Sequence, residues 1–225
     1  MGRISLLLAL TVMVVPACGR EAPEPPPGSR QITIPTPDGV QLDAIEVGSG
    51  TDVAVLSHGA TGTMTGFYRL AEALAADGWR VIAYDARGVG ESTGGPDEDR
   101  ETDLRAVVAY ARDTEAGSIL LGGASLGASL SISMAAELEA DALVSLSAPA
   151  GSFGADRTAD DLADAIPVLV AAAQDNEPYT SDARALAEAF GVEPVIVGGD
   201  GHGTGMFGEN PDLIEQIVTF ADGTR

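Results

Sequence analysis

The sequence predicts a three-layer α/β/α sandwich whose sheet is mostly parallel, with an antiparallel hairpin at its N-terminal edge. Three observations predict it: alternating polar and apolar residues where the folded part begins, short apolar runs farther along, and amphipathic stretches of helical length between those runs. Strands that alternate with helices build a parallel sheet with helices on both faces. With 225 residues, of which 45% are apolar, we expect one domain with one sizeable core.

The elements can be placed along the chain from this periodicity. The alternating segments 32–34 and 40–45 flank the turn residues Pro37-Asp-Gly39, which predicts a β-hairpin. Buried parallel strands are expected at 53–56, 81–84, 119–121, 143–146, 168–172 and 195–197. Helices are expected at 66–76, 97–112, 126–139, 158–165, 181–190 and 210–221. The longest gap among the later elements, about nine residues at 149–157, leaves little room for a lid domain.

The net charge of the chain is -22, from 34 acidic residues against 12 basic ones. Such a surface repels phosphate backbones and anionic lipid headgroups, which excludes nucleic acid as an expected partner. A high-salt habitat or a GC-rich genome would produce the same composition. The charge therefore does not point to a function.

The first 17 residues predict an export signal. Arg3 precedes an apolar run from Ile4 to Val15, which is shorter than the roughly 20 residues that a spanning helix needs. Cys18, the single cysteine, follows Val15-Pro-Ala17, and this stretch resembles the lipobox of bacterial lipoproteins, although Pro16 stands where Ala or Ser is usual. The resemblance implies a diacylglycerol on Cys18 and a protein anchored on the outer side of the cytoplasmic membrane. An ordinary secretory signal and an uncleaved anchor are the alternatives.

Three segments follow from this interpretation. Residues 1–17 are the signal peptide, 18–30 are the lipidated cysteine with a Pro-rich extended tether, and 31–225 are the folded domain.

A serine is the candidate nucleophile. Gly123-Ala-Ser-Leu-Gly127 matches the G-x-S-x-G pattern, in which a tight strand-to-helix turn exposes the serine hydroxyl. A predicted strand leads into the motif and a predicted helix leaves it, and the helix N-terminus favours a developing anion. Ser125 is therefore predicted to be the nucleophile, and a helix-capping serine in a Gly-rich turn is the alternative.

A serine hydroxyl needs a base, and an acid must orient that base. The chain has two histidines. Where a G-x-S-x-G serine stands between a strand and a helix, the serine, the acid and the histidine typically follow one another in that order along the chain, which selects His202 over His58. Asp175 follows a predicted strand at its carboxyl end, where ligands gather in open α/β sheets, and is the predicted acid. Glu177 and Asp200 are the rivals, but Asp200 lies only two residues from His202 and Glu177 is held by Pro178.

The tetrahedral intermediate needs two backbone N–H donors, each worth roughly 3 kcal/mol of barrier. Leu126, which follows the nucleophile, is one expected donor. Ala60, in the loop after the strand at 53–56, is the other, and His58 is then expected to hold that loop.

Five stretches together are similar to the α/β-hydrolase superfamily. They are Ser57-His-Gly-Ala60, Tyr84-Asp-Ala-Arg-Gly-Val-Gly-Glu-Ser92, Gly123-Ala-Ser-Leu-Gly127, Gln174-Asp175 and Gly201-His-Gly203. The resemblance implies that Ser125, Asp175 and His202 hydrolyse a small-molecule carboxylic ester through an acyl-enzyme, with no metal or organic cofactor, and that the loop at 85–92 is structural. A monomer with a shallow, open site for short or medium acyl groups is expected. A thioesterase or small peptidase with the same triad, and a non-catalytic binding lipoprotein, are the alternatives.

Aromatic residues make up 4% of the chain, which limits what could line such a site. The candidates are Tyr68, Phe153, Tyr179 and Phe207, with core packing as the alternative for each.

Overall fold

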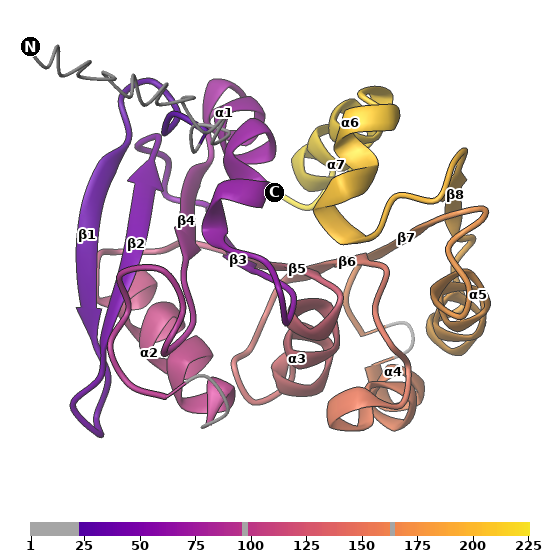
Figure 1. Ribbon diagram of the computed structural model, residues 1–225, viewed down its shortest axis with the longest axis horizontal. Helices are drawn as coiled ribbons and strands as arrows, with labels where there is room; N and C mark the ends of the chain where they lie inside the picture. The colour runs from indigo at the N-terminus through magenta and orange to yellow at the C-terminus, as the bar shows by residue number, and fades with distance from the viewer. Residues whose placement is uncertain (1–22, 96–98, 163–164) are drawn as a thin grey trace, which may run out of the picture.

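An eight-stranded sheet forms the middle layer of the protein (Figure 1). The computed structural model describes residues 23–95, 99–162 and 165–225. In chain order the strands are β1 (Arg30–Pro35), β2 (Gln41–Val47), β3 (Val53–Ser57), β4 (Arg80–Tyr84), β5 (Ile119–Ala124), β6 (Ala142–Leu146), β7 (Val168–Ala173) and β8 (Val195–Val197). They lie side by side in the order β1-β2-β4-β3-β5-β6-β7-β8. β2 pairs antiparallel with both β1 and β4, and every other pair is parallel, which confirms the predicted sheet and its N-terminal hairpin.

Helices cover both faces of this sheet. They are α1 (Tyr68–Ala76), α2 (Arg100–Asp113), α3 (Leu126–Met134), α4 (Ala155–Leu162), α5 (Tyr179–Phe190), α6 (Met206–Glu209) and α7 (Asp212–Asp222). Figure 1 shows α1, α6 and α7 on one face and α2 to α5 on the other. Successive side chains of a strand point to opposite faces. In β3, accordingly, Val53 and Val55 join one apolar core, while Ala54 and Leu56 join the other. The predicted three-layer sandwich is confirmed.

Two helices differ from the prediction. The helix expected over 126–139 ends at Met134, because the residues after it form separate turns and Glu139 has a positive φ of 45°. Apolar spacing continues through these turns, so the sequence pattern does not reveal the end. α6 is only four residues long, which is too short for a periodic pattern.

The end of the predicted tether that the structure describes lies against the domain. Ser29 N–H donates to Pro26 O at 3.0 Å, and Pro26 is buried. Arg30 already belongs to β1. The predicted signal peptide and Cys18 lie outside the described residues. Within the parts that are described, no helix combines the length and apolar character needed to cross a membrane.

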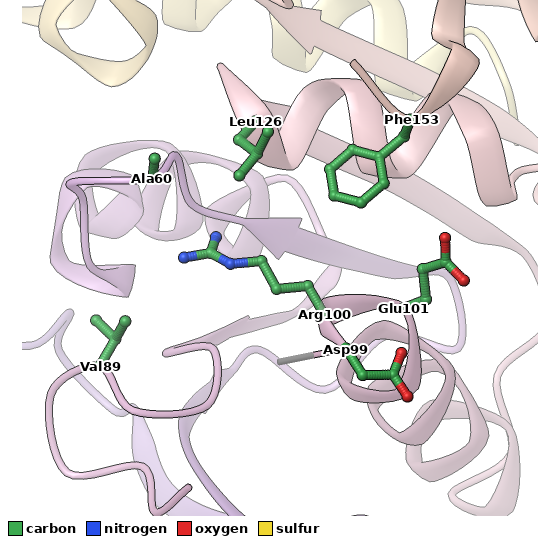
Figure 2. Close-up of a pocket in the computed structure, with 7 residues that line it drawn as sticks. All are labelled: Ala60, Val89, Asp99, Arg100, Glu101, Leu126 and Phe153. Atoms are coloured by element: carbon green, nitrogen blue, oxygen red, sulfur yellow. The ribbon is translucent and has the colours of Figure 1, made fainter. Parts of the chain in front are cut away.

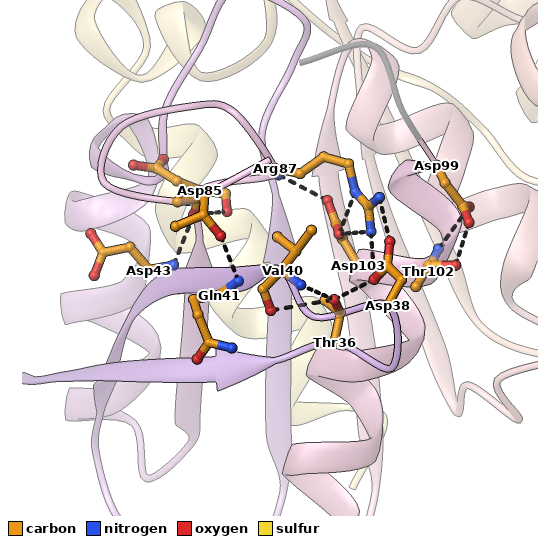
Figure 3. A network of polar contacts seen from close by, with 12 residues as sticks. Thr36, Asp38, Val40, Gln41, Asp43, Asp85, Arg87, Asp99, Thr102 and Asp103 are labelled. Atoms are coloured by element: carbon orange, nitrogen blue, oxygen red, sulfur yellow. Dashed lines mark hydrogen bonds and ion pairs between the residues drawn. The ribbon is translucent and has the colours of Figure 1, made fainter. Parts of the chain in front are cut away.

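A buried arginine fixes the loop at 85–92, which follows β4 (Figure 3). Arg87 Nε donates to Asp103 Oδ1 at 2.9 Å, and its Nη1 donates to Asp38 Oδ2 at 2.8 Å. Arg87 is 2% exposed and Asp103 is fully buried. Removing one partner of a buried ion pair costs about 3–5 kcal/mol, because the other charge is left without compensation. These contacts give the loop a structural role and hold Val89 at the edge of the site described next.

Candidate active site

Ser125 lies in the turn between β5 and α3. Its backbone has φ 52° and ψ -121°, a conformation that side-chain-bearing residues rarely adopt. Such strain costs about 1–3 kcal/mol and persists only where the surroundings enforce it. Here Ser125 N–H donates to Leu146 O of β6 at 2.8 Å. The serine therefore stands at the carboxyl edge of the sheet, half-buried, at the start of a helix.

The two glycines of the G-x-S-x-G motif are required by close backbone approaches. A Cβ atom on Gly123 would lie 2.3 Å from Gly127 O, and one on Gly127 would lie 2.2 Å from Ser57 O. Neither distance is possible for a real side chain, so any larger residue would push the turn apart. Close packing within and around this strand-to-helix turn, residues 123–127, thus explains the motif. We call this turn the elbow.

Ala60 and Leu126, the two residues predicted to supply backbone N–H donors, lie close to the serine. Gly59 is so close to Ser125 that a Cβ atom on it would lie 3.1 Å from the serine Cβ. The next residue, Ala60, borders the same cavity as Leu126, the residue that follows the serine (Figure 2). Among the described residues, neither the Ala60 nor the Leu126 amide donates to a backbone acceptor. Neither amide is thus committed to the backbone bonds of the described residues, and the oxyanion hole at Ala60 and Leu126 stays a prediction.

His58 supports this loop with both ring nitrogens. Its Nδ1 contacts Gly59 O at 2.6 Å, and its Nε2 accepts from Ala86 N–H at 2.9 Å. Burial lowers the pKa of His58 to about 4, so the ring is neutral at pH 7. Since both nitrogens are engaged, His58 is a poor candidate for the catalytic base.

His202 lies in the loop after β8, which packs directly on the elbow. The next residue, Gly203, donates from its N–H to Ser147 Oγ at 3.0 Å, and a Cβ atom on Gly203 would lie 3.0 Å from Ala124 Cβ. The ring of Tyr179 lies against the imidazole, with 4.1 Å between the ring centroids. Burial lowers the pKa of His202, which keeps the ring neutral at pH 7.

The hydrogen bonds of the described residues do not include one between Ser125 and the His202 ring. Bonds of this kind often shorten only when substrate is bound. The packing of Gly203 on Ala124 nevertheless brings the two side chains to the same edge of the sheet.

The structure joins His202 to Asn176, which the sequence reasoning missed. His202 Nδ1 donates to Asn176 Oδ1 at 2.8 Å. The predicted acid, Asp175, is exposed; its backbone N–H donates to Gly199 O at 2.9 Å, and among the described residues its carboxylate forms no ion pair. The structure thus brings His202 together with Asn176, the residue that follows Asp175. The sequence reasoning considered only aspartate and glutamate as the residue that orients the histidine. Asn176 was therefore missed, although an asparagine oxygen can also orient a histidine.

Among the described residues, neither rival acid forms a hydrogen bond or an ion pair with His202. Glu177 accepts from Ser181 N–H at 3.2 Å, which places its carboxylate at the start of α5. Asp200 is exposed. No group of three or more metal-ligating side chains gathers within the described ranges.

A cavity of about 510 Å³ opens beside the two amides (Figure 2). It is lined by Ala60, Val89, Asp99, Arg100, Glu101, Leu126 and Phe153. Phe153 is 40% exposed and has a positive φ of 52°. Of the other aromatic candidates, Tyr179 lies against His202, whereas Tyr68 and Phe207 are buried in the core.

Comparison with known proteins agrees with this fold. Residues 53–170 match the α/β hydrolase fold family. A lidless α/β serine hydrolase from Xanthomonas campestris is similar in structure, with 25% identity, a TM-score of 0.70, and 89% of this chain and 96% of that chain covered. An esterase from Pyrococcus furiosus has 18% identity and a TM-score of 0.75, over 86% of this chain and 91% of that chain.

A serine hydrolase homologue from Coxiella burnetii has 24% identity and a TM-score of 0.71, over 84% of this chain and 96% of that chain. No curated protein matches the chain. The family match covers more than half of the chain, including the elbow and the loops on either side of it. The chain belongs to the α/β-hydrolase family.

Proposed function

We propose that this protein is a serine esterase that hydrolyses small carboxylic esters through an acyl-enzyme. The observation that carries the proposal is the strained elbow, which holds Ser125 at the start of α3, close to Gly59 and beside the loop that contains His202. His202 accepts the Ser125 proton while Oγ attacks the ester carbon, and the amides of Ala60 and Leu126 bind the oxyanion. His202 then protonates the leaving alcohol. Water, activated by the same imidazole, releases the acid and restores the serine.

Asn176 is the orienting residue in this proposal. Because Nδ1–H donates to its amide oxygen, the lone pair of His202 is on Nε2, the nitrogen that must accept the serine proton. Asparagine carries no charge, so it orients the ring without stabilising the imidazolium as a carboxylate would. The combination of histidine with asparagine is known from papain-like proteases.

A fluorophosphonate probe tests the proposal directly. The probe should attach to the protein at one site, because only an activated serine displaces its fluoride. Mass spectrometry of the intact protein and of its peptides should then locate the adduct on Ser125. Prior acid unfolding should abolish the reaction, since activation depends on the folded elbow. Labelling of the unfolded protein, or an adduct on another serine, would contradict the assignment.

The cavity suggests the size of the substrate. Its lining is partly apolar, and no separate cap domain appears in the described parts of the chain. Esters with short or medium acyl groups are therefore the proposed substrates, with thioesters and small amides as weaker candidates.

We further propose that the protein is exported and anchored by lipid on Cys18. Each buried methylene adds about 0.8 kcal/mol of membrane affinity, so two or three acyl chains give stable attachment. Cys18→Ser should move the protein from the membrane fraction of a bacterial expression host to the soluble or secreted fraction. Quantitative immunoblotting of the fractions measures this. A Ser181→Ala control should remain with the membrane, and an unchanged distribution of Cys18→Ser would contradict the proposal.

A further inference from the structure

Arg100 gives the cavity beside the two amides a positive charge. It is the first residue of α2, and its side chain extends between Ala60, Leu126 and Val89 (Figure 2). Its Nη1 lies 3.5 Å from His58 O, two residues before Ala60. The guanidinium is thus held next to the loop that supplies one of the two amides.

With respect to the residues that the structure describes, the guanidinium keeps most of its hydrogen-bonding capacity. The long contact to His58 O occupies one of five N–H donors. In the ranges 23–95, 99–162 and 165–225, no carboxylate forms an ion pair with Arg100. This contrasts with Arg87 and Arg105, which both pair with carboxylates.

Two acidic residues also line the cavity, but they are engaged elsewhere. Asp99 accepts from Thr102 N–H at 3.1 Å and caps α2. Glu101 lies 3.5 Å from Arg105 Nη2. Figure 2 shows both carboxylates on the side of the cavity away from the guanidinium. The cavity therefore has a positive end beside the amides and a negative end opposite.

We propose that Arg100 is an anion subsite that selects esters whose acyl group carries a carboxylate, which makes the protein a hydrolase of short dicarboxylic acid hemiesters. The inference rests on the proposed function. With the ester oxygen at the amides of Ala60 and Leu126, a short acyl chain would bring a terminal carboxylate to the guanidinium, which lies between Ala60 and Val89 (Figure 2). Arginine binds carboxylates through two parallel hydrogen bonds. The net charge of the chain does not prevent this, because distant charges are screened over about 8 Å in physiological salt.

Monoethyl succinate and ethyl butyrate form the matched test pair. They share the leaving alcohol and a four-carbon acyl chain, and differ in a terminal carboxylate against a methyl group. The wild-type protein should show a higher kcat/KM for monoethyl succinate, measured by ethanol release. Arg100→Gln should lower the succinate-to-butyrate ratio of kcat/KM by about tenfold to a hundredfold, the effect expected for a charged hydrogen bond. Arg100→Lys should retain part of the preference.

Arg112→Gln is the matched control, because it removes an arginine from the same helix about 18 Å away. The ratio should not change in this variant. Added salt should lower the wild-type ratio, since the recognised group is charged. As a second readout, succinate should inhibit ethyl butyrate hydrolysis by the wild-type protein more strongly than butyrate does, and Arg100→Gln should remove that difference.

The outcomes separate the subsite from the esterase proposal. If ethyl butyrate is hydrolysed in a Ser125-dependent way but Arg100→Gln leaves the ratio unchanged, the subsite is wrong and the esterase stands. If 2-carboxyethyl butyrate is preferred over propyl butyrate, while the succinate pair shows no preference, the acyl-side assignment is overturned. If neither ester of either pair is hydrolysed by the wild-type protein, both proposals fail together.

Discussion

Replacing Ser125 by alanine should lower kcat for p-nitrophenyl butyrate by about 10⁶-fold, the loss seen when a serine protease loses its nucleophile. The magnitude follows because the covalent route disappears entirely, and only the amides of Ala60 and Leu126 remain to stabilise the transition state. Release of p-nitrophenolate under saturating substrate measures kcat. His202→Ala should cause a similar loss, and the double variant should be no slower than either single variant, because the two residues act as one unit.

Ser133→Ala is a suitable control for this loss. Ser133 lies on α3, the helix that follows Ser125, and its hydroxyl donates to Leu130 O within that helix. Its replacement tests whether a serine change on the neighbouring helix disturbs the site, and kcat should stay within about twofold because the only hydrogen bond given for this hydroxyl lies within its own helix. Turnover by Ser125→Ala at the wild-type rate would refute the nucleophile. Undiminished turnover by His202→Ala would show that His202 is not the base and would leave His58, the other histidine, as the candidate.

The second large loss of kcat is expected when Asn176 is replaced, and not when its neighbour Asp175 is replaced. Asn176→Ala should lower kcat by about 10²-fold, because a histidine that is no longer oriented is displaced from the reacting atoms. Asp175→Ala should change kcat very little, since its exposed carboxylate does not contact the imidazole. Steady-state rates of the two variants, measured side by side, make the comparison. If Asp175→Ala instead loses about 10⁴-fold, the size of loss known for a triad acid, then Asp175 is the acid as the sequence predicts.

Asn176→Asp adds a pH signature that a purely structural residue would not give. In the wild-type protein, burial lowers the pKa of His202, so activity should rise with pH through a midpoint below the ordinary pKa of histidine and then level off. A carboxylate at position 176 favours the imidazolium and should raise the pKa of His202. The acid limb of the kcat/KM profile should therefore move to higher pH, with a higher plateau rate. An acid limb that stays in place would show that residue 176 does not face the imidazole.

The sequence predicted the elements that depend on periodicity and on close backbone packing. The strands that flank Ser125 appear as short apolar runs, and the glycines at 123 and 127 are fixed by contacts too close for any side chain. The apolar runs can be recognised locally because each strand is buried along its own length, and the glycines can be recognised because they form a known five-residue motif, although one of the contacts that require them is with Ser57, far away in the sequence.

The residue that orients His202 could not be predicted from local sequence patterns. Asp175 and Asn176 are neighbours after β7, and which of them faces His202 depends on how the turn pairs with Gly199 across the sheet edge. Similarly, the direction of Arg100 depends on the place where α2 begins relative to the loop at 58–60. Both are outcomes of tertiary packing between segments far apart in sequence, and residue type alone gives no information about them.

The loop at 85–92, held by Arg87 and Asp103, has an evolutionary consequence. Val89 reaches the cavity from this loop, whereas the residues to which we assign proton transfer follow β5, β7 and β8. Substitutions at 89, 100 or 153 can therefore change which acyl groups are accepted without moving the imidazole or the serine. Combinatorial libraries at these three positions should yield variants with new substrate ranges at a low rate of misfolding. The same separation would let natural descendants of this chain diversify in substrate while their reaction chemistry stays constant.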